Sequence, residues 1–189
     1  MTELEAIAVA LRAAPVRPLQ ATLVRCVALL PLTAGGVPDY LFTSGQANRY
    51  NPAGVRCVYF SEDEATARLE YARRFGISRG ARQPVGIYFA SVSLTKVVDL
   101  ADAATRDALK LKPKELALPW QLAKKATRTQ LLGLVASQKA FAAIRFPSDA
   151  ARAGGTSGCN VVIFRDGVQA PDRVEILGPT RKPLQKWPD

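Results

Sequence analysis

The segment RCVYFSEDEATARLEYARRF, residues 56–75, changes from a strand pattern to a helix pattern without a long loop in between. Residues 56–60 are mostly β-branched or aromatic, which predicts a short strand. Ser61 follows as the predicted N-cap, and Glu64 three residues later completes a capping-box pattern. The helix is expected to continue to about Phe75 with its apolar side chains on one face. A strand that leads directly into a helix predicts a mixed architecture of helices and strands.

The flanking sequence continues this mixture of helix and strand patterns. Helices are predicted at 2–14, 102–109 and 127–140, and strands at 21–30, 84–92, 96–99, 143–146, 160–164 and 173–177. A long loop rich in Gly, Pro and Asn is predicted at 31–54. Because no repeat or linker divides the chain, the expected fold class is α/β of the α+β kind, one domain with mixed, mostly antiparallel sheets and flanking helices. Residues 1–20 are expected to form a helix and connector, 21–178 the main domain, and 179–189 a basic, loosely ordered tail.

The composition excludes several kinds of chemistry. The 189 residues include 26 Lys and Arg, 16 Asp and Glu and no histidine, which gives a formal net charge of +10. Without histidine there is no Ser-His or Cys-His couple, no imidazole base and no histidine-ligated zinc. Acid–base or electrostatic chemistry therefore falls to carboxylates, hydroxyls, Lys or Arg. The positive charge predicts an anionic partner: nucleic acid, a phosphate-bearing metabolite or an acidic protein.

The cysteines and the apolar stretches indicate a location in the cytoplasm. The chain has three widely spaced cysteines, Cys26, Cys57 and Cys159. Their number and spacing favour reduced thiols over a disulfide framework or a zinc site. The most apolar stretch, 23–32, is interrupted by Arg25 and Pro31 and is too short to span a bilayer. Arg25 is therefore either an edge arginine that faces solvent or a residue that requires a partner or a ligand.

Three polar residues on separate predicted elements are candidate site residues. Arg49 lies in the long loop, Glu70 lies on the helix after the opening strand, and Ser148 begins a Gly-rich loop. An arginine binds pyrophosphate through two parallel hydrogen bonds, and a glutamate stabilises an oxocarbenium-like centre. With a serine hydroxyl to hold a ribose or an amide, this set suits cleavage of an N-glycosidic bond in a dinucleotide. The chain has no GxGxxG or Walker motif, so a dinucleotide is expected to bind in a non-Rossmann manner.

Each candidate also has a structural interpretation. Arg49 in a polar loop is commonly solvated, and Ser148 suits a turn or a helix cap. Glu64 competes with Glu70, but a role at the helix N-terminus already accounts for it. Glu62 is the least favoured of the three carboxylates. Glu70 is preferred because it lies on or near the inward face of its helix.

Several segments, in order along the chain, resemble the RES-domain family, which is named for Arg, Glu and Ser. The matching segments are LVRCV, TSGQANRYNPAGVRCVYFSE, TARLE, VVDLAD, the region from Trp120 to TQLLG, and FPSDAARAGGTSGCNVVIF. The resemblance implies an ADP-ribosyltransferase-like fold and a RES-like catalytic domain over 21–178. It also implies a toxin enzyme that cleaves the nicotinamide–ribose bond of NAD+ by phosphorolysis or hydrolysis. No cofactor is implied, since NAD+ is the substrate and inorganic phosphate the co-substrate. The expected partner is a cognate Xre-type antitoxin, with no direct nucleic-acid binding and no membrane contact.

The resemblance also assigns site residues. It implies the catalytic residues Arg49, Glu70 and Ser148, the substrate-binding residues Arg25, Tyr50, Tyr59 and Asn160, and no metal ligand. Arg25 and Arg49 would lie near the pyrophosphate or the nicotinamide ribose, and Tyr50 or Tyr59 would stack on the nicotinamide ring. Glu70 would stabilise the positive charge that develops on the anomeric carbon.

Two other functions remain open from the sequence. The first is an ADP-ribosyltransferase that uses the same fold and substrate but modifies a protein or a nucleotide. The second, less favoured, is a basic nucleic-acid-binding module without enzymatic activity. That module would bind DNA or RNA with an affinity that falls steeply with salt.

Overall fold

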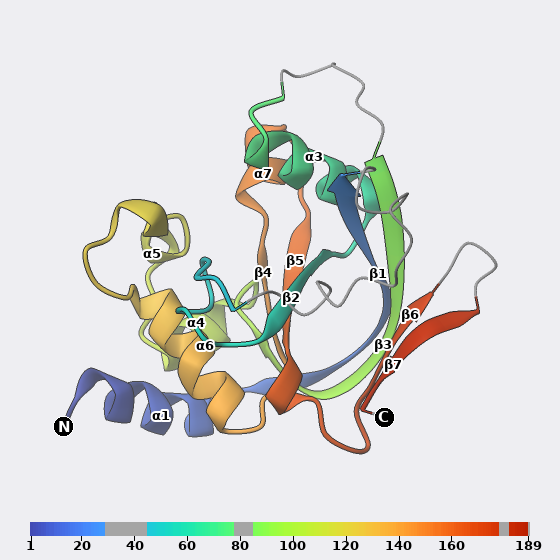
Figure 1. Ribbon diagram of the computed structural model, residues 1–189. Helices are drawn as coiled ribbons and strands as arrows, with labels where there is room; N and C mark the ends of the chain where they lie inside the picture. The colour runs from blue at the N-terminus through green and yellow to red at the C-terminus, as the bar shows by residue number, and fades with distance from the viewer. Residues whose placement is uncertain (29–44, 78–84, 178–181, 189) are drawn as a thin grey trace.

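The computed structural model describes residues 1–28, 45–77, 85–177 and 182–188 (Figure 1). Its helices are α1 (Glu3–Ala13), α3 (Glu64–Arg74), α4 (Ala103–Ala108), α5 (Pro113–Leu116), α6 (Arg128–Gln138) and α7 (Asp149–Ala153), with 3-10 turns η2 (Trp120–Leu122) and η3 (Arg165–Gly167). Its strands are β1 (Val16–Ala28), β2 (Cys57–Ser61), β3 (Val85–Asp99), β4 (Ala143–Pro147), β5 (Cys159–Phe164), β6 (Arg173–Leu177) and β7 (Pro183–Trp187).

The strands pair in the order β1-β2-β5-β4-β3-β6-β7, and β1 also pairs with β3. Five strands therefore close on themselves, and β6 and β7 extend the sheet beyond β3. Among the described strands only β3 and β4 run parallel. The closure between β1 and β2 rests on one antiparallel Cα pair, Val24 with Ser61, so this side of the ring is sparsely paired.

The ring separates two apolar clusters. The inner cluster includes Leu23, Phe60, Tyr88, Val161 and Ile163. The outer cluster joins the other strand face to α1, α6 and the loop before β2, through residues such as Leu11, Tyr50, Leu132, Phe146 and Val162. Side chains alternate along β5, so Val161 and Val162 belong to different clusters. Figure 1 shows α3 and α7 beside each other at one end of β4 and β5, away from α1 and α6.

The N-terminal helix agrees with its prediction, whereas β1 starts earlier than expected. Thr2 and Glu5 form the predicted capping box, with the Thr2 hydroxyl accepting from the Glu5 amide. β1 begins at Val16 rather than at residue 21. It contains Pro18, which lies in the predicted connector and not in a predicted strand. The pairing of β1 with β3 shifts register at this position, where a residue without an N–H is tolerated.

Three other predictions need correction. The strands predicted at 84–92 and 96–99 are replaced by one long strand, Val85–Asp99, because β3 pairs with β1 from Val85 to Val98 across a shift in register. Ser61 does not cap α3, since Asp63 is the N-cap and accepts from the Thr66 amide at 2.7 Å. Residues 183–187 are not loosely ordered. They form β7 against β6, and the ring of Trp187 packs under the Arg165 guanidinium at 4.1 Å. The predicted loop at 31–54 is described only from residue 45.

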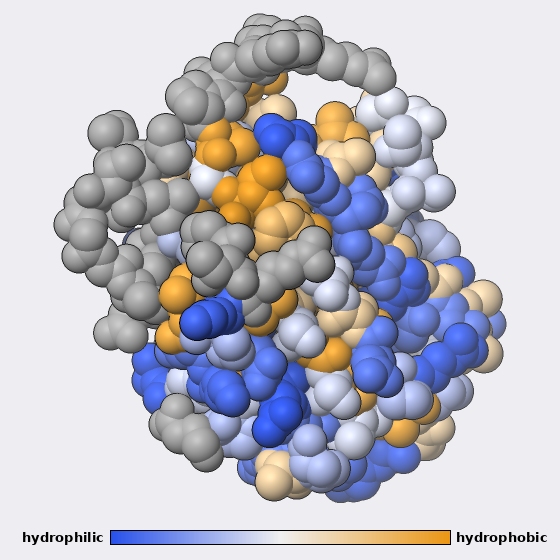
Figure 2. Space-filling model, turned by 90° about the vertical axis from the view of Figure 1, so that its right-hand side faces the viewer, coloured by the Kyte–Doolittle hydropathy of each residue, from blue (hydrophilic) through white to orange (hydrophobic). Residues whose placement is uncertain are grey.

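Figure 2 shows how apolar and hydrophilic residues are distributed on one face of the molecule. On the face drawn in Figure 2, apolar residues gather in the upper middle, and hydrophilic residues cover most of the lower part. Among the described residues, no helix has both the length and the apolar character needed to cross a membrane.

Candidate active site

Two buried polar side chains converge on the carboxylate of Glu70. The Ser148 hydroxyl donates to Oε1 at 2.7 Å, and the Asn160 Nδ2 donates to the same oxygen at 2.6 Å. Ser148 is 2% exposed and Asn160 is 7% exposed, whereas Glu70 is partly exposed. Within the described part of the chain, both of these donors to Glu70 contact the same carboxylate oxygen, Oε1. The structure thus brings together three of the residues predicted from the sequence.

Local folding explains why these three side chains meet. Ser148 is the N-cap of α7: its hydroxyl accepts from the Ala151 amide at 3.0 Å while it donates to Glu70. Its own amide donates to the Gly158 carbonyl at 2.8 Å, which ties the start of α7 to the approach to β5. A Cβ on Gly158 would lie 2.1 Å from the Thr66 hydroxyl of α3. Glycine at this position therefore lets α3 approach, and that approach places Glu70 over Asn160.

Arg49 is connected to this group by an ion pair with Asp149, the residue that follows Ser148. Its guanidinium forms an ion pair with Asp149 at 3.4 Å, and the Arg49 side chain is only 18% exposed. The same guanidinium donates to the carbonyls of Leu116 and Leu118, the latter at 3.3 Å. Arg49 is therefore not a solvated loop residue. It links the loop before β2 to the segment around α5 and to the residue that follows Ser148.

The two predicted tyrosines support the loop that carries Arg49. Tyr50 is 1% exposed, and its ring lies 4.3 Å from the ring of Phe146. The Tyr59 hydroxyl accepts from the Tyr50 amide at 3.0 Å and donates to Asn51 at 2.9 Å. Burial raises the pKa of both phenols, so both hydroxyls keep their protons at neutral pH. In this arrangement Tyr50 is part of the core, and Tyr59 is half-buried.

Arg25 lies on a different face of the sheet from the Glu70 group. It is half-buried on β1 and pairs in register with Tyr88 of β3. Its neighbour Val24 is the register partner of Ser61, whose own partner on β5 is Asn160. Because successive strand residues point to opposite faces, Arg25 points away from the face that carries Ser61 and Asn160.

The two competing carboxylates, Glu64 and Glu62, both form ion pairs with arginine side chains. Glu64 pairs with Arg68 at 2.7 Å on the surface of α3. Glu62 binds Arg145 through two hydrogen bonds of 2.6 and 2.9 Å, and Arg145 also binds Asp99 at 3.0 Å. These hydrogen bonds raise the pKa of Arg145. Among the three carboxylates, Glu70 is the one that Ser148 and Asn160 contact.

Three residues with clear roles near the site were missed from the sequence. The Ser61 hydroxyl donates to Asn160 Oδ1 at 2.7 Å, on the opposite side of that amide from Glu70. Gln130 of α6 donates to the Asn48 carbonyl at 2.9 Å, and a Cβ on Gly133 would lie 1.7 Å from the Tyr50 carbonyl oxygen. A short-range pattern carries no signal for such contacts, because the partners are distant in sequence.

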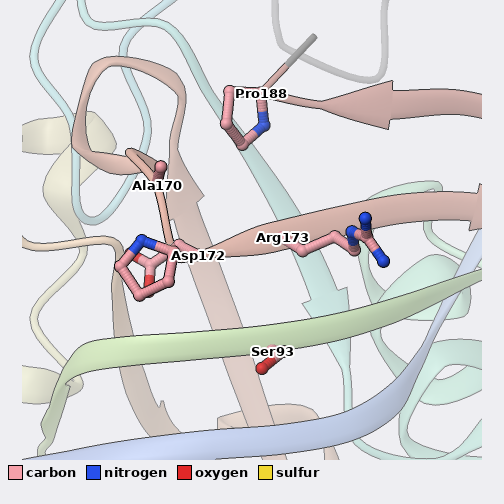
Figure 3. Close-up of a pocket in the computed structure, with 6 residues that line it drawn as sticks. Ser93, Ala170, Asp172, Arg173 and Pro188 are labelled. Atoms are coloured by element: carbon pink, nitrogen blue, oxygen red, sulfur yellow. The ribbon is translucent and has the colours of Figure 1, made fainter.

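A separate hollow lies where the middle of β3, the start of β6 and the end of β7 meet. Its volume is about 370 Å³, and it is lined by Ser93, Ala170, Pro171, Asp172, Arg173 and Pro188 (Figure 3). None of the predicted site residues lines it, and Asp172 is held by Thr95 through two hydrogen bonds of 2.6 and 2.7 Å. The described residues also contain no group of three His, Cys, Asp or Glu side chains suited to a metal ion. The Glu70 group remains the best candidate for chemistry.

Comparison with known proteins agrees with the resemblance drawn from the sequence. The model of the RES domain matches residues 22–185. Among solved structures, a chain in the crystal structure of the M. tuberculosis MbcT-MbcA toxin-antitoxin complex is similar, with a TM-score of 0.62 and 14% identity. The match covers 86% of this chain and 84% of that chain. No curated protein sequence matches. The predicted class, one mixed α+β domain with a mostly antiparallel sheet, is confirmed.

Proposed function

The chain belongs to the RES domain family, and we propose that it is a toxin enzyme that cleaves the nicotinamide–ribose bond of NAD+. The observation that carries the proposal is the convergence of Ser148 and Asn160 on one oxygen of Glu70. A carboxylate fixed by two buried donors suits a reaction that creates positive charge on a sugar carbon.

The proposed reaction breaks the bond between the ribose anomeric carbon and the nicotinamide nitrogen. The bonding electrons leave with nicotinamide, which neutralises its ring, and positive charge develops on the anomeric carbon. Glu70 stabilises that charge, while Ser148 and Asn160 keep its carboxylate in one orientation before the substrate arrives. An oxygen of phosphate or water then bonds to the anomeric carbon, and with water one proton is released. The products are nicotinamide and either ADP-ribose 1-phosphate or ADP-ribose.

We assign the pyrophosphate to Arg49 in preference to Arg25. Arg49 adjoins Ser148 through Asp149, whereas Arg25 points to the other face of β1. A guanidinium forms paired hydrogen bonds with phosphate oxygens, so Arg49 would exchange part of its present set of partners for the substrate. The net charge of +10 favours the approach of both the dinucleotide and phosphate. Tyr59 remains the candidate for contact with the nicotinamide ring.

We also propose a protein inhibitor as the partner of this chain. An enzyme that consumes NAD+ damages the cell that makes it unless it is silenced. The likeness to a chain of the MbcT-MbcA toxin-antitoxin complex supports an antitoxin in this role, of the Xre type implied by the family resemblance.

The test is NAD+ turnover by purified protein free of any partner. The protein is incubated with NAD+ in the presence and absence of phosphate, and products are identified by proton and phosphorus NMR. A phosphorylated ADP-ribose indicates phosphorolysis, free ADP-ribose indicates hydrolysis, and ADP-ribose attached to a macromolecule indicates transfer. Persistence of NAD+ under both conditions would refute the proposed function.

A further inference from the structure

We propose that Ser61 is a positioning residue for the reaction, because it fixes the Asn160 amide so that Nδ2 faces Glu70. Its effect on turnover rests on the proposed function, while its effect on the Asn160 amide does not. The sequence favoured Ser61 as a helix cap, a role that Asp63 fills in the structure.

A continuous set of hydrogen bonds connects Ser61 to the carboxylate. The Ser61 hydroxyl donates to Asn160 Oδ1 at 2.7 Å, and Asn160 Nδ2 donates to Glu70 Oε1 at 2.6 Å. Ser61 and Asn160 are register partners on β2 and β5, so their side chains lie on the same face of the sheet. Ser61 is 4% exposed and Asn160 is 7% exposed, which limits the access of water to either group.

The chemistry of an amide explains why this contact matters. One end of the Asn160 side chain accepts hydrogen bonds, and the other end donates them. If the amide turned over, Oδ1 would face the Glu70 carboxylate, and two acceptors would oppose each other. The Ser61 hydroxyl holds Oδ1 on the far side from Glu70. The donor end therefore stays directed at the carboxylate.

The end of β2 is itself anchored, which keeps the Ser61 hydroxyl in place. The amide of Glu62 donates to the Cys159 carbonyl at 3.0 Å, and its carboxylate is bound by Arg145 of β4. The register places Arg145 in a row with Val161 and Phe60, on the opposite face from Ser61. An ionic contact on one face thus secures the strand end that presents Ser61 on the other.

The first test separates kcat from KM. Ser61→Ala is expected to lower kcat about 10- to 100-fold with little change in KM, since small misplacements of reacting groups have effects of this size. Ser61→Thr keeps the hydroxyl and is expected to restore most of the rate. The matched control is Ser137→Ala, which removes a hydroxyl that donates to the Leu134 carbonyl at 2.8 Å on α6, and it should leave kcat unchanged.

A double-mutant cycle tests whether Ser61 acts through Asn160. In an Asn160→Ala background, Ser61→Ala should cause no further loss of kcat, because the group that it positions is already absent. An equal loss in both backgrounds would overturn the proposal. So would a Ser61→Ala variant with the kcat of the wild type.

A spectroscopic measurement makes the proposal independent of the reaction. The side-chain amide resonance of Asn160 is identified by its loss in Asn160→Ala, using nitrogen-15 labelled protein. Ser61→Ala should shift this resonance and speed the exchange of its protons with water, whereas Ser61→Thr and Ser137→Ala should not. An unchanged resonance in Ser61→Ala would overturn the positioning role. If the wild type leaves NAD+ intact, the proposed function fails, and this measurement still decides the role of Ser61.

Discussion

Replacing Glu70 by Gln or by Ala separates its chemical role from its structural one. Gln keeps a carbonyl oxygen that accepts from Ser148 and Asn160, so Glu70→Gln should change the free energy of unfolding by no more than about 1 kcal/mol. Ala removes the acceptor and leaves two donors that are 2% and 7% exposed without a partner. An unsatisfied buried donor costs about 1–3 kcal/mol. Because Glu70 itself is partly exposed and water can enter, Glu70→Ala should lose about 2–4 kcal/mol.

The effect of Glu70→Gln on turnover follows from the charge that it removes. Two unit charges about 4 Å apart at an effective dielectric constant of about 20 interact with about 4 kcal/mol. That energy corresponds to roughly 10³-fold in rate, and partial exposure lowers the expected loss of kcat to roughly 10²- to 10³-fold. Both variants should therefore lose activity, whereas only Glu70→Ala should lose substantial stability.

The assays are urea unfolding followed by circular dichroism and NAD+ consumption at saturating substrate. Glu64→Gln is the matched control: Glu64 lies on the same helix, is 49% exposed and pairs with Arg68 on the surface. Such pairs contribute about 1 kcal/mol or less, so this variant should keep both stability and turnover. Wild-type turnover in Glu70→Gln would refute the catalytic assignment. Equal stability of Glu70→Ala and Glu70→Gln would refute the argument from unsatisfied donors.

Three other variants test contacts that stabilise the fold. Gly133→Ala would place a Cβ 1.7 Å from the Tyr50 carbonyl oxygen, so it should lower the free energy of unfolding by about 1–3 kcal/mol in urea titrations and reduce turnover by displacing the loop before β2. Arg145→Met leaves two partly exposed carboxylates unpaired and should lower the same free energy by about 2 kcal/mol. Hydrogen bonds from Thr105 lower the pKa of Asp102 below its ordinary value of 3.8, so this group contributes stability above that pH and loses it as the pH falls through the lowered pKa. Asp102→Asn should therefore weaken the dependence of stability on pH below about pH 4. The measurement is the midpoint of thermal unfolding as a function of pH, and a midpoint that falls with acid as steeply as in the wild type would contradict this.

Local patterns predicted the parts of the fold that depend on near neighbours. The capping box of Thr2 and Glu5 needs only residues three apart, and it is present. The same rule applied to Ser61 and Glu64 is wrong, because pairing with β5 takes Ser61 into β2 and leaves Asp63 to cap the helix. The length of β3 is likewise set by its pairing with β1, which a window along the sequence does not contain.

The sequence predicted the acceptor Glu70 and its donors Ser148 and Asn160 as candidate site residues, but it did not predict the residues that hold them in place. Glu70, Ser148 and Asn160 are separated by up to 90 positions in the chain, and they meet in the structure. The sequence resemblance supplied these positions, while the geometry adds which atoms touch. Tyr50 was one of two candidates, with Tyr59, for stacking on the nicotinamide ring, and its own ring packs on Phe146 in the core. Burial of a loop tyrosine depends on the helix that packs over it, and no local pattern records that contact.

Ser148 explains why a structural and a functional interpretation of one residue need not compete. A serine hydroxyl has one proton and two lone pairs. The Ala151 amide occupies a lone pair at 3.0 Å, and the geometry of the helix cap fixes the direction of that contact. The proton is then free to point only away from the amide, and Glu70 Oε1 lies there at 2.7 Å. The cap of α7 therefore orients the donor that holds the carboxylate, so the same hydrogen-bonded group that begins the helix also prepares the site.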